Sequence, residues 1–136
     1  PSLPILVEST IQKLENLDKP FFLLIESAQI DWAAHDNDPM HMNSEMIEFD
    51  NTIKTVFDFI DKDDNTLVVI TADHETGGAA ITGGNLLKSK VKNNYVSGDH
   101  TATMVPVFSF GYKAQNFKGV YDNTEIFDKL RTIIEK

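Results

Sequence analysis

The sequence predicts an α/β fold in which short buried strands alternate with amphipathic helices. Three continuous apolar runs of strand length lie at residues 21–25, 67–72 and 105–110. Turn residues bound these runs, a pattern that is typical of strands buried on both faces. A helical pattern separates the first two runs, so the order strand, helix, strand over residues 21–72 describes a parallel crossover unit.

The chain opens with an amphipathic helix, expected over residues 2–17 and ended by Asp18-Lys19-Pro20. The apolar residues of this helix share one face: Leu3, Val7, Ile11 and Leu14. The first strand follows at residues 21–25 and ends at Glu26. Residues 27–42 carry no clean period.

A second amphipathic helix is expected over residues 44–60, with Asn43 or Ser44 as its N-cap. Its apolar residues again lie on one face: Met46, Phe49, Ile53, Val56, Phe57 and Ile60. The polar turn at residues 61–65 then leads into the second strand at residues 67–72.

Glycines and polar residues separate the second strand from the third. Gly77-Gly78 and Gly83-Gly84 bracket residues 79–82, which we expect to form a short hairpin or an irregular excursion. Residues 85–98 are polar connecting chain, and the third strand follows at residues 105–110.

A proline and a final helix complete the pattern. Pro106 cannot donate to a strand ladder, so it belongs at the start of the third strand or at a sheet edge. Asn123 or Thr124 is the expected cap of the last helix. The apolar residues of that helix share one face: Ile126, Phe127, Leu130, Ile133 and Ile134.

Length and composition predict a single folded domain over residues 1–136. The chain is long enough for one hydrophobic core and short for two, and 41% of its residues are hydrophobic. It begins at Pro1, without an initiating Met, where a helix already starts. We therefore expect a piece of a longer protein.

Charge and residue usage exclude several classes of function. The 21 acidic residues outnumber the 12 basic ones, and the formal net charge of −9 argues against a nucleic-acid surface. No apolar stretch approaches the roughly 20 residues that span a bilayer. Residues 1–136 contain no signal peptide, which a fragment would have lost. The absence of cysteine excludes disulfides and thiolate zinc sites, so His and carboxylate groups are the strong metal ligands available.

Carboxylates and imidazoles stand next to the predicted strands. Asp73 and His74 directly follow the second strand, and ligands of open α/β sheets collect beyond the carboxyl ends of strands. Glu26 ends the first strand, where a buried carboxylate needs a cation or hydrogen-bond donors. His100 directly precedes the segment that leads into the third strand.

Spacing adds a further pair of candidate metal ligands. Asp31 and His35 are four positions apart, so on a helical turn they would project from one face and could hold one ion. Oxygen and imidazole ligands without sulfur suit zinc or manganese, and a carboxylate corner at Glu26 suits magnesium. The pattern indicates more than one ion.

Each candidate also has an interpretation without a metal. A lone Asp-x-x-x-His pair is common on a solvated helix face, and Asp73-His74 could form a turn with a helix cap. His100 could bond to backbone, and Glu26 could pair with a lysine. Three further residues are interpreted as solvated: Asp36, Asp38 and His41.

Three sequence blocks, taken together, resemble the alkaline phosphatase family in order and spacing. FLLIESAQIDWAAH at residues 22–35 resembles a strand and loop with a magnesium-binding Glu, followed by an Asp and a His of one zinc site. NTLVVITADHE at residues 65–75 is similar to the family block whose Asp and His bind a second zinc. SGDHT at residues 97–101 resembles the block that returns a third ligand, a His, to the first zinc.

The resemblance implies a fold, a metal set and a reaction. The fold is a three-layer sandwich with a mostly parallel sheet flanked by helices. The reaction is hydrolysis of phosphate monoesters through a phosphoserine, with two zinc ions and one magnesium ion as cofactors. The implied ligands are Asp31, His35 and His100 for one zinc, Asp73 and His74 for the other, and Glu26 for magnesium. The implied parent is homodimeric and periplasmic or extracellular.

Departures from the family pattern define what we expect of this chain. The nucleophilic Ser in its Asp-Ser-Ala context, the bridging Asp and the phosphate-binding Arg are absent, so no catalytic residue is assigned. The usual His-Thr-Gly-Glu is replaced by the sequence at residues 100–103, and Trp32 follows Asp31. We expect a C-terminal part of an alkaline phosphatase catalytic domain that is inactive alone.

Two alternatives stay open from the sequence. A phosphodiesterase, a sulfatase or a cofactor-independent phosphoglycerate mutase would have the same metal core, and the nucleophile region upstream would distinguish them. A non-catalytic metal-binding domain would keep the fold without the chemistry.

Overall fold

A computed structural model describes residues 1–135 of the chain. The chain divides into two compact units. The first comprises Pro1–Phe59 and Thr76–Thr101, and the second comprises Ile60–Glu75 and the chain from Ala102 onward.

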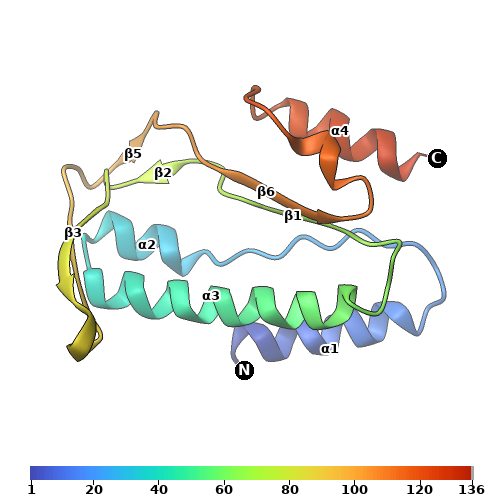
Figure 1. Cartoon of the computed structure of the whole chain (residues 1–136), viewed down its shortest axis with the longest axis horizontal. Helices are drawn as coiled ribbons and strands as arrows, with labels where there is room; N and C mark the ends of the chain where they lie inside the picture. Colours follow the sequence, from blue (N-terminus) through green and yellow to red (C-terminus); the bar gives the residue numbers. More distant parts are fainter. Residues whose placement is uncertain (136) are drawn as a thin grey trace. The chain divides into compact units, whose positions relative to one another are not determined.

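Three helices form most of the first unit (Figure 1). Helix α1 (Leu3–Glu15) confirms the first predicted helix, with ends that differ by one and two residues. On its inner face Val7 and Ile11 are 4% and 6% exposed, as the apolar period predicts. The Leu3 N–H donates to Glu48 Oε1 at 2.8 Å, which ties the start of α1 to α3 (Pro39–Ile60).

Helix α3 (Pro39–Ile60) begins five residues before the predicted start, and the cap expected at residues 43–44 is wrong. Asp38 Oδ1 accepts from the N–H groups of Met40 at 2.9 Å and His41 at 3.1 Å, so Asp38 satisfies the first turn. A proline at the first helical position fits this start, because its missing N–H would lack a helical partner there. Asp38 is exposed, as expected, and it also has a structural role as the cap of α3.

Residues 21–25 form an extended connection to α2 (Gln29–His35), and the strand expected there is not formed (Figure 1). Within residues 1–135 no backbone hydrogen bond joins this segment to another. Phe22 and Leu24 are 61% and 79% exposed, in place of the burial expected on both faces. A β-strand needs a hydrogen-bonded partner strand, and because residues 21–25 have none here, the predicted parallel crossover does not form.

The glycine-bracketed segment of the first unit is a full antiparallel hairpin. Strand β3 (Ala80–Asn85) pairs with β4 (Lys90–Asn94), and the short helix η1 (Leu86–Lys88) connects them. The hairpin is longer than the sequence predicts and extends to Asn94, into the segment expected to be polar connecting chain. The two-residue strands β2 (Glu75–Thr76) and β5 (His100–Thr101) form a second pair.

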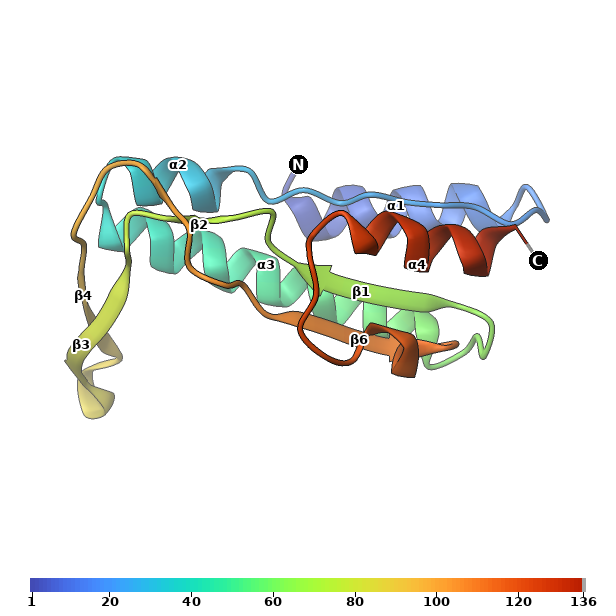
Figure 2. The same ribbon diagram turned by 90° about the horizontal axis from the view of Figure 1, so that it is seen from above.

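The second unit is built on one antiparallel strand pair, which Figure 2 shows side by side. Strand β1 (Leu67–Thr71) pairs with β6 (Val107–Gly111), in a register that places Leu67 opposite Gly111. Both strands were predicted, and Pro106 lies just before the first ladder residue of β6, as its missing donor requires.

Two short helical segments complete the second unit. Helix η2 (Ala114–Phe117) buries Phe117, which is 3% exposed. Helix α4 (Glu125–Ile134) confirms the last predicted helix. Thr124 occupies its N-cap position, but the Thr124 hydroxyl makes no cap bond to the helix and donates to Asp122 Oδ1 at 2.9 Å. This bond and the Thr124 N–H lower the pKa of Asp122 below its ordinary value.

The predicted sandwich with a mostly parallel sheet is not seen in residues 1–135. The strands form three separate two-stranded sheets, and the long pairs β1–β6 and β3–β4 are antiparallel. A parallel sheet needs the segment at residues 21–25 as a paired strand, and that pairing is missing. No helix in the described part of the chain is long and apolar enough to span a membrane.

Candidate metal centre

Helix α2 presents the first two donors of the candidate centre. Asp31 and His35 are four residues apart, and His35 Nε2 lies 3.4 Å from Asp31 Oδ2. Both side chains are about one-third exposed, at 35% and 36%. Ala33 and Ala34 on the same helix are buried, so other faces of this short helix pack against the rest of the unit. The helical spacing predicted from the sequence thus brings the two groups together.

His100 on β5 adds a third donor from a distant part of the chain. Its Nε2 lies 3.0 Å from His35 Nε2 and 3.6 Å from Asp31 Oδ1. The rings of His35 and His100 have centroids 4.9 Å apart. One carboxylate and two imidazoles therefore converge, and we call Asp31, His35 and His100 the three-donor cluster.

The spacing of the three-donor cluster fits a small divalent ion. A tetrahedral ion with ligand bonds of about 2.0–2.1 Å places its donor atoms about 3.3 Å apart. The contacts within the cluster, from 3.0 to 3.6 Å, bracket that separation. The donor set of two nitrogens and a carboxylate is also one that zinc accepts.

The backbone fixes the tautomer of His35. His35 Nδ1 lies 2.6 Å from the carbonyl oxygen of Gly98. A carbonyl only accepts, so Nδ1 carries the proton. In the neutral ring Nε2 is then the unprotonated nitrogen, and it faces the cluster. This orientation is the one that a metal-binding imidazole requires.

Thr76 is a residue of this site that the sequence analysis missed. Its hydroxyl donates to Asp31 Oδ1 at 2.5 Å, and the residue is only 8% exposed. The bond joins residues 45 positions apart, a separation that periodicity does not address. The only sequence signal for Thr76 was its position, two residues after His74 and directly before Gly77-Gly78.

Asp73 and His74 lie in the second unit, two and three residues after the end of β1. His74 Nε2 is 3.3 Å from Asp73 Oδ2. The Asp73 side chain is 88% exposed and the His74 side chain is 29% exposed. The pair follows the carboxyl end of its strand, where the sequence analysis expected it.

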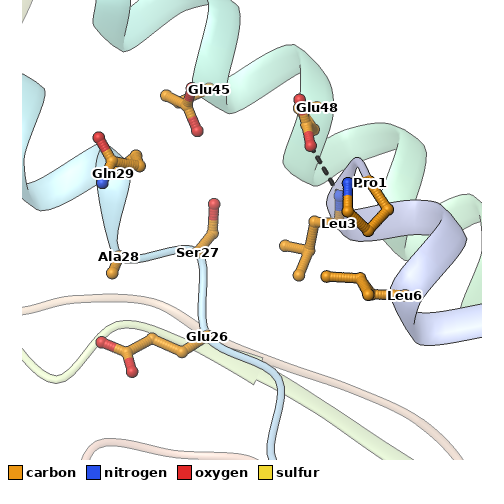
Figure 3. A pocket seen from close by; sticks show the side chains of 9 residues that line it. All are labelled: Pro1, Leu3, Leu6, Glu26, Ser27, Ala28, Gln29, Glu45 and Glu48. Atoms are coloured by element: carbon orange, nitrogen blue, oxygen red, sulfur yellow. Dashed lines mark hydrogen bonds between the residues drawn. The ribbon is translucent and has the colours of Figure 1, made fainter. Parts of the chain in front are cut away.

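Glu26 lines a different part of the first unit. It borders a pocket of about 270 Å³ between α1, α3 and the segment before α2, shown in Figure 3. Two other carboxylates, Glu45 and Glu48, line the same pocket, and no member of the three-donor cluster does. The Glu26 carboxylate points away from Leu3 and Leu6 (Figure 3).

His41, the remaining histidine, is on α3. Its Nε2 lies 3.7 Å from Glu45 Oε1, one helical turn along. Its side chain is 33% exposed, so it is a partly covered helix residue. Asp36 is exposed at the end of α2, as expected.

Comparison with known proteins supplies the family. The alkaline phosphatase family model matches residues 1–95. Alkaline phosphatase 3 of Bacillus subtilis is 49% identical over 81 residues, which are 60% of this chain and 18% of that protein. The alkaline phosphatase of Escherichia coli is 27% identical over 150 aligned residues, covering 98% of this chain and 32% of its own length.

Solved structures of alkaline phosphatases have the same fold over nearly all of this chain. The enzyme from the Antarctic bacterium TAB5 superposes with a TM-score of 0.89 at 36% identity, covering 98% of this chain and 41% of its own. A cold-active alkaline phosphatase from Shewanella sp. gives the same TM-score at 27% identity, covering 98% of this chain and 50% of its own. A mutant of the TAB5 enzyme has magnesium bound in its M3 site.

The chain thus spans 18% to 32% of the length of the curated relatives named here and about half or less of the solved chains. The family model covers well over half of the 136 residues. The chain belongs to the alkaline phosphatase family.

Proposed function

We propose that this chain contributes part of the metal centre of an enzyme that hydrolyses phosphate monoesters through a phosphoserine. The observation that carries the proposal is the three-donor cluster, whose atoms lie 3.0 to 3.6 Å apart. Family membership supports the reaction class, because the relatives over this chain are named alkaline phosphatases. The substrates and the activity belong to the whole protein and are part of the proposal.

The proposed ligands divide into three sets. Asp31, His35 and His100 hold one zinc ion, and Asp73 with His74 contributes to a second. Glu26 contributes to a magnesium site, which is consistent with the magnesium of the TAB5 mutant. When bound, such ions neutralise the charge of a phosphoryl group and lower the pKa of an attacking oxygen.

The residues of this chain bind and orient, and none of them is assigned as the nucleophile. The Gly98 carbonyl orients His35, and Thr76 bonds to Asp31. The seven serines include none in an Asp-Ser-Ala context. The net charge of −9 repels a phosphate unless cations reverse the sign locally. We therefore propose a chain that binds metal and does not complete the reaction by itself.

The wider context of the whole protein follows from the family. We propose a homodimeric parent that acts in the periplasm or outside the cell, since the relatives include bacterial alkaline phosphatases. Size measurement and fractionation of the parent protein test these two points.

The metal assignment is tested by titrating the chain with zinc and with cobalt, using dissociation constants and cobalt absorption as readouts. Losing a residue that only orients a metal ligand typically weakens metal binding about 10–100-fold. We expect a larger loss of affinity from each of the three ligand variants, Asp31→Asn, His35→Ala and His100→Ala. The matched control is His41→Ala, which removes an imidazole outside the cluster and should leave the constants unchanged.

Two results would contradict the assignment. One is a wild-type chain that binds neither ion at micromolar concentration. The other is a set of cluster variants whose affinities match that of His41→Ala.

A further inference from the structure

We propose that Thr76 is a positioning residue that holds the carboxylate of Asp31 in its metal-binding orientation. This inference rests on the function proposed above, and it adds a residue that orients a metal ligand to the residues that bind the metal. Thr76 would touch neither metal nor substrate and would act only through Asp31.

The contact between the two side chains is short and sheltered. Thr76 Oγ1 lies 2.5 Å from Asp31 Oδ1. An ionised carboxylate only accepts, so the hydroxyl donates, and such charge-assisted bonds are about twice as strong as neutral ones. Thr76 is 8% exposed, so water has little access to compete for its hydroxyl.

The bond fixes how the two oxygens of Asp31 face the histidines. Oδ1, which accepts from Thr76, lies 3.6 Å from His100 Nε2, and Oδ2 lies 3.4 Å from His35 Nε2. Without the hydroxyl, the Asp31 carboxylate loses its one hydrogen-bond donor among these contacts that is not itself a proposed ligand. Residues that orient a metal ligand in this way typically account for about 10–100-fold in metal affinity.

The backbone that carries Thr76 is itself fixed. The Gly77 N–H donates to the carbonyl of Asp99 at 2.9 Å, and the Ser97 N–H donates to the Gly77 carbonyl at 3.1 Å. Gly77 has a φ of +84°, and a Cβ there would lie 3.0 Å from the Ala34 carbonyl oxygen on α2. Thr76 is therefore anchored between α2, which carries Asp31, and the segment that leads to His100.

Threonine suits this position for two reasons. Its branched Cβ restricts the first side-chain torsion, so the hydroxyl direction is limited. Valine has nearly the same shape but no hydroxyl, so Thr76→Val removes the donor and keeps most of the packing. Serine keeps the donor on a less restricted side chain.

The test compares the full chain with Thr76→Val and Thr76→Ser in titrations with zinc and cobalt. We expect Thr76→Val to raise the dissociation constants about 10–100-fold and to change the visible absorption of bound cobalt, which reports ligand geometry. Thr76→Ser should retain most of the affinity and the wild-type cobalt spectrum. The matched control is Thr10→Val on α1, whose lost hydroxyl bonds only to the Leu6 carbonyl, at 2.7 Å.

The outcomes separate this inference from the proposed function. If the wild-type chain binds no metal, the proposed function fails and the inference fails with it. If the wild-type chain binds and Thr76→Val has the same affinity and cobalt spectrum, the positioning role is overturned while the proposed function stands. Circular dichroism of the metal-free variants checks folding, and Thr76→Ala carries the same prediction should Thr76→Val not fold.

Discussion

Asp31 contacts three side chains within the candidate centre. Its two carboxylate oxygens contact the imidazoles of His35 and His100 and the hydroxyl of Thr76. Because the Asp31 side chain is 35% exposed, any single ion pair with it adds little to the stability of the fold. Its orientation is set by several partners at once, which is the condition for a preorganised ligand.

Residue roles were predictable from the sequence where the partners are close in the chain. The pairing of Asp31 with His35 follows from helical spacing alone. The approach of His100 was anticipated only through the family resemblance, because 65 residues separate it from His35. The capping role of Asp38 was missed because the sequence analysis placed the start of the helix at residues 43–44.

A turn carboxylate provides a pH-dependent prediction at the residue scale. The Thr66 hydroxyl and the Asn65 N–H donate to Asp63, and these bonds lower the pKa of Asp63 below its ordinary value. Because the pKa of Asp63 is lower in the folded state than in the unfolded state, its ionised form stabilises the fold. This contribution is complete above the unfolded-state pKa, near 3.9, and is lost as the pH falls through the folded-state pKa.

We therefore expect Asp63→Ala to reduce the free energy of unfolding at pH 7 by about 1 kcal/mol. The deficit relative to wild type should shrink as the pH falls below about 4, and urea unfolding at several pH values measures it. Asp64→Ala is the control, since Asp64 makes no hydrogen bond within residues 1–135. A deficit that is the same at every pH would contradict the assignment.

At the scale of elements, helices were predicted better than strands. Helices α1, α3 and α4 depend on local periodicity and appear where the sequence places them, apart from the early start of α3. Strand formation at residues 21–25 depends on partners elsewhere, and none pairs with it within residues 1–135. The same dependence on partners explains why the three apolar runs wrongly predicted a parallel crossover over residues 21–72.

The inner face of α1 gives a stability prediction. Ile11 is 6% exposed, and truncating a buried isoleucine to alanine typically costs about 2–5 kcal/mol. We expect Ile11→Ala to lower the free energy of unfolding by an amount in this range. Ile5→Ala on the same helix is the control, because Ile5 is 58% exposed and should change stability by no more than about 0.5 kcal/mol. Equal effects in urea unfolding would contradict the observed orientation of α1.

At the scale of the whole molecule, this chain carries the proposed metal ligands without an assigned nucleophile. It spans 32% of the Escherichia coli enzyme and 41% of the TAB5 structure. Its acidic surplus of nine charges disfavours the approach of a phosphate, and bound cations would reverse that sign locally.

We predict that the purified 136-residue chain, loaded with zinc and magnesium, does not hydrolyse a simple aryl phosphate above the rate of a His100→Ala control. The reason is that no serine in this chain has the context of the family nucleophile. Release of the aryl alcohol is followed by absorbance, with contaminating enzyme excluded by repeated purification. Turnover that depends on His100 would overturn this prediction.

Anomalous scattering at the zinc absorption edge, from a crystal of the zinc-loaded chain, shows directly whether the three-donor cluster binds zinc. We predict an anomalous peak about 2.0–2.2 Å from His35 Nε2, from His100 Nε2 and from the Asp31 carboxylate. A well-ordered zinc-loaded crystal with no peak among these three side chains would contradict this prediction.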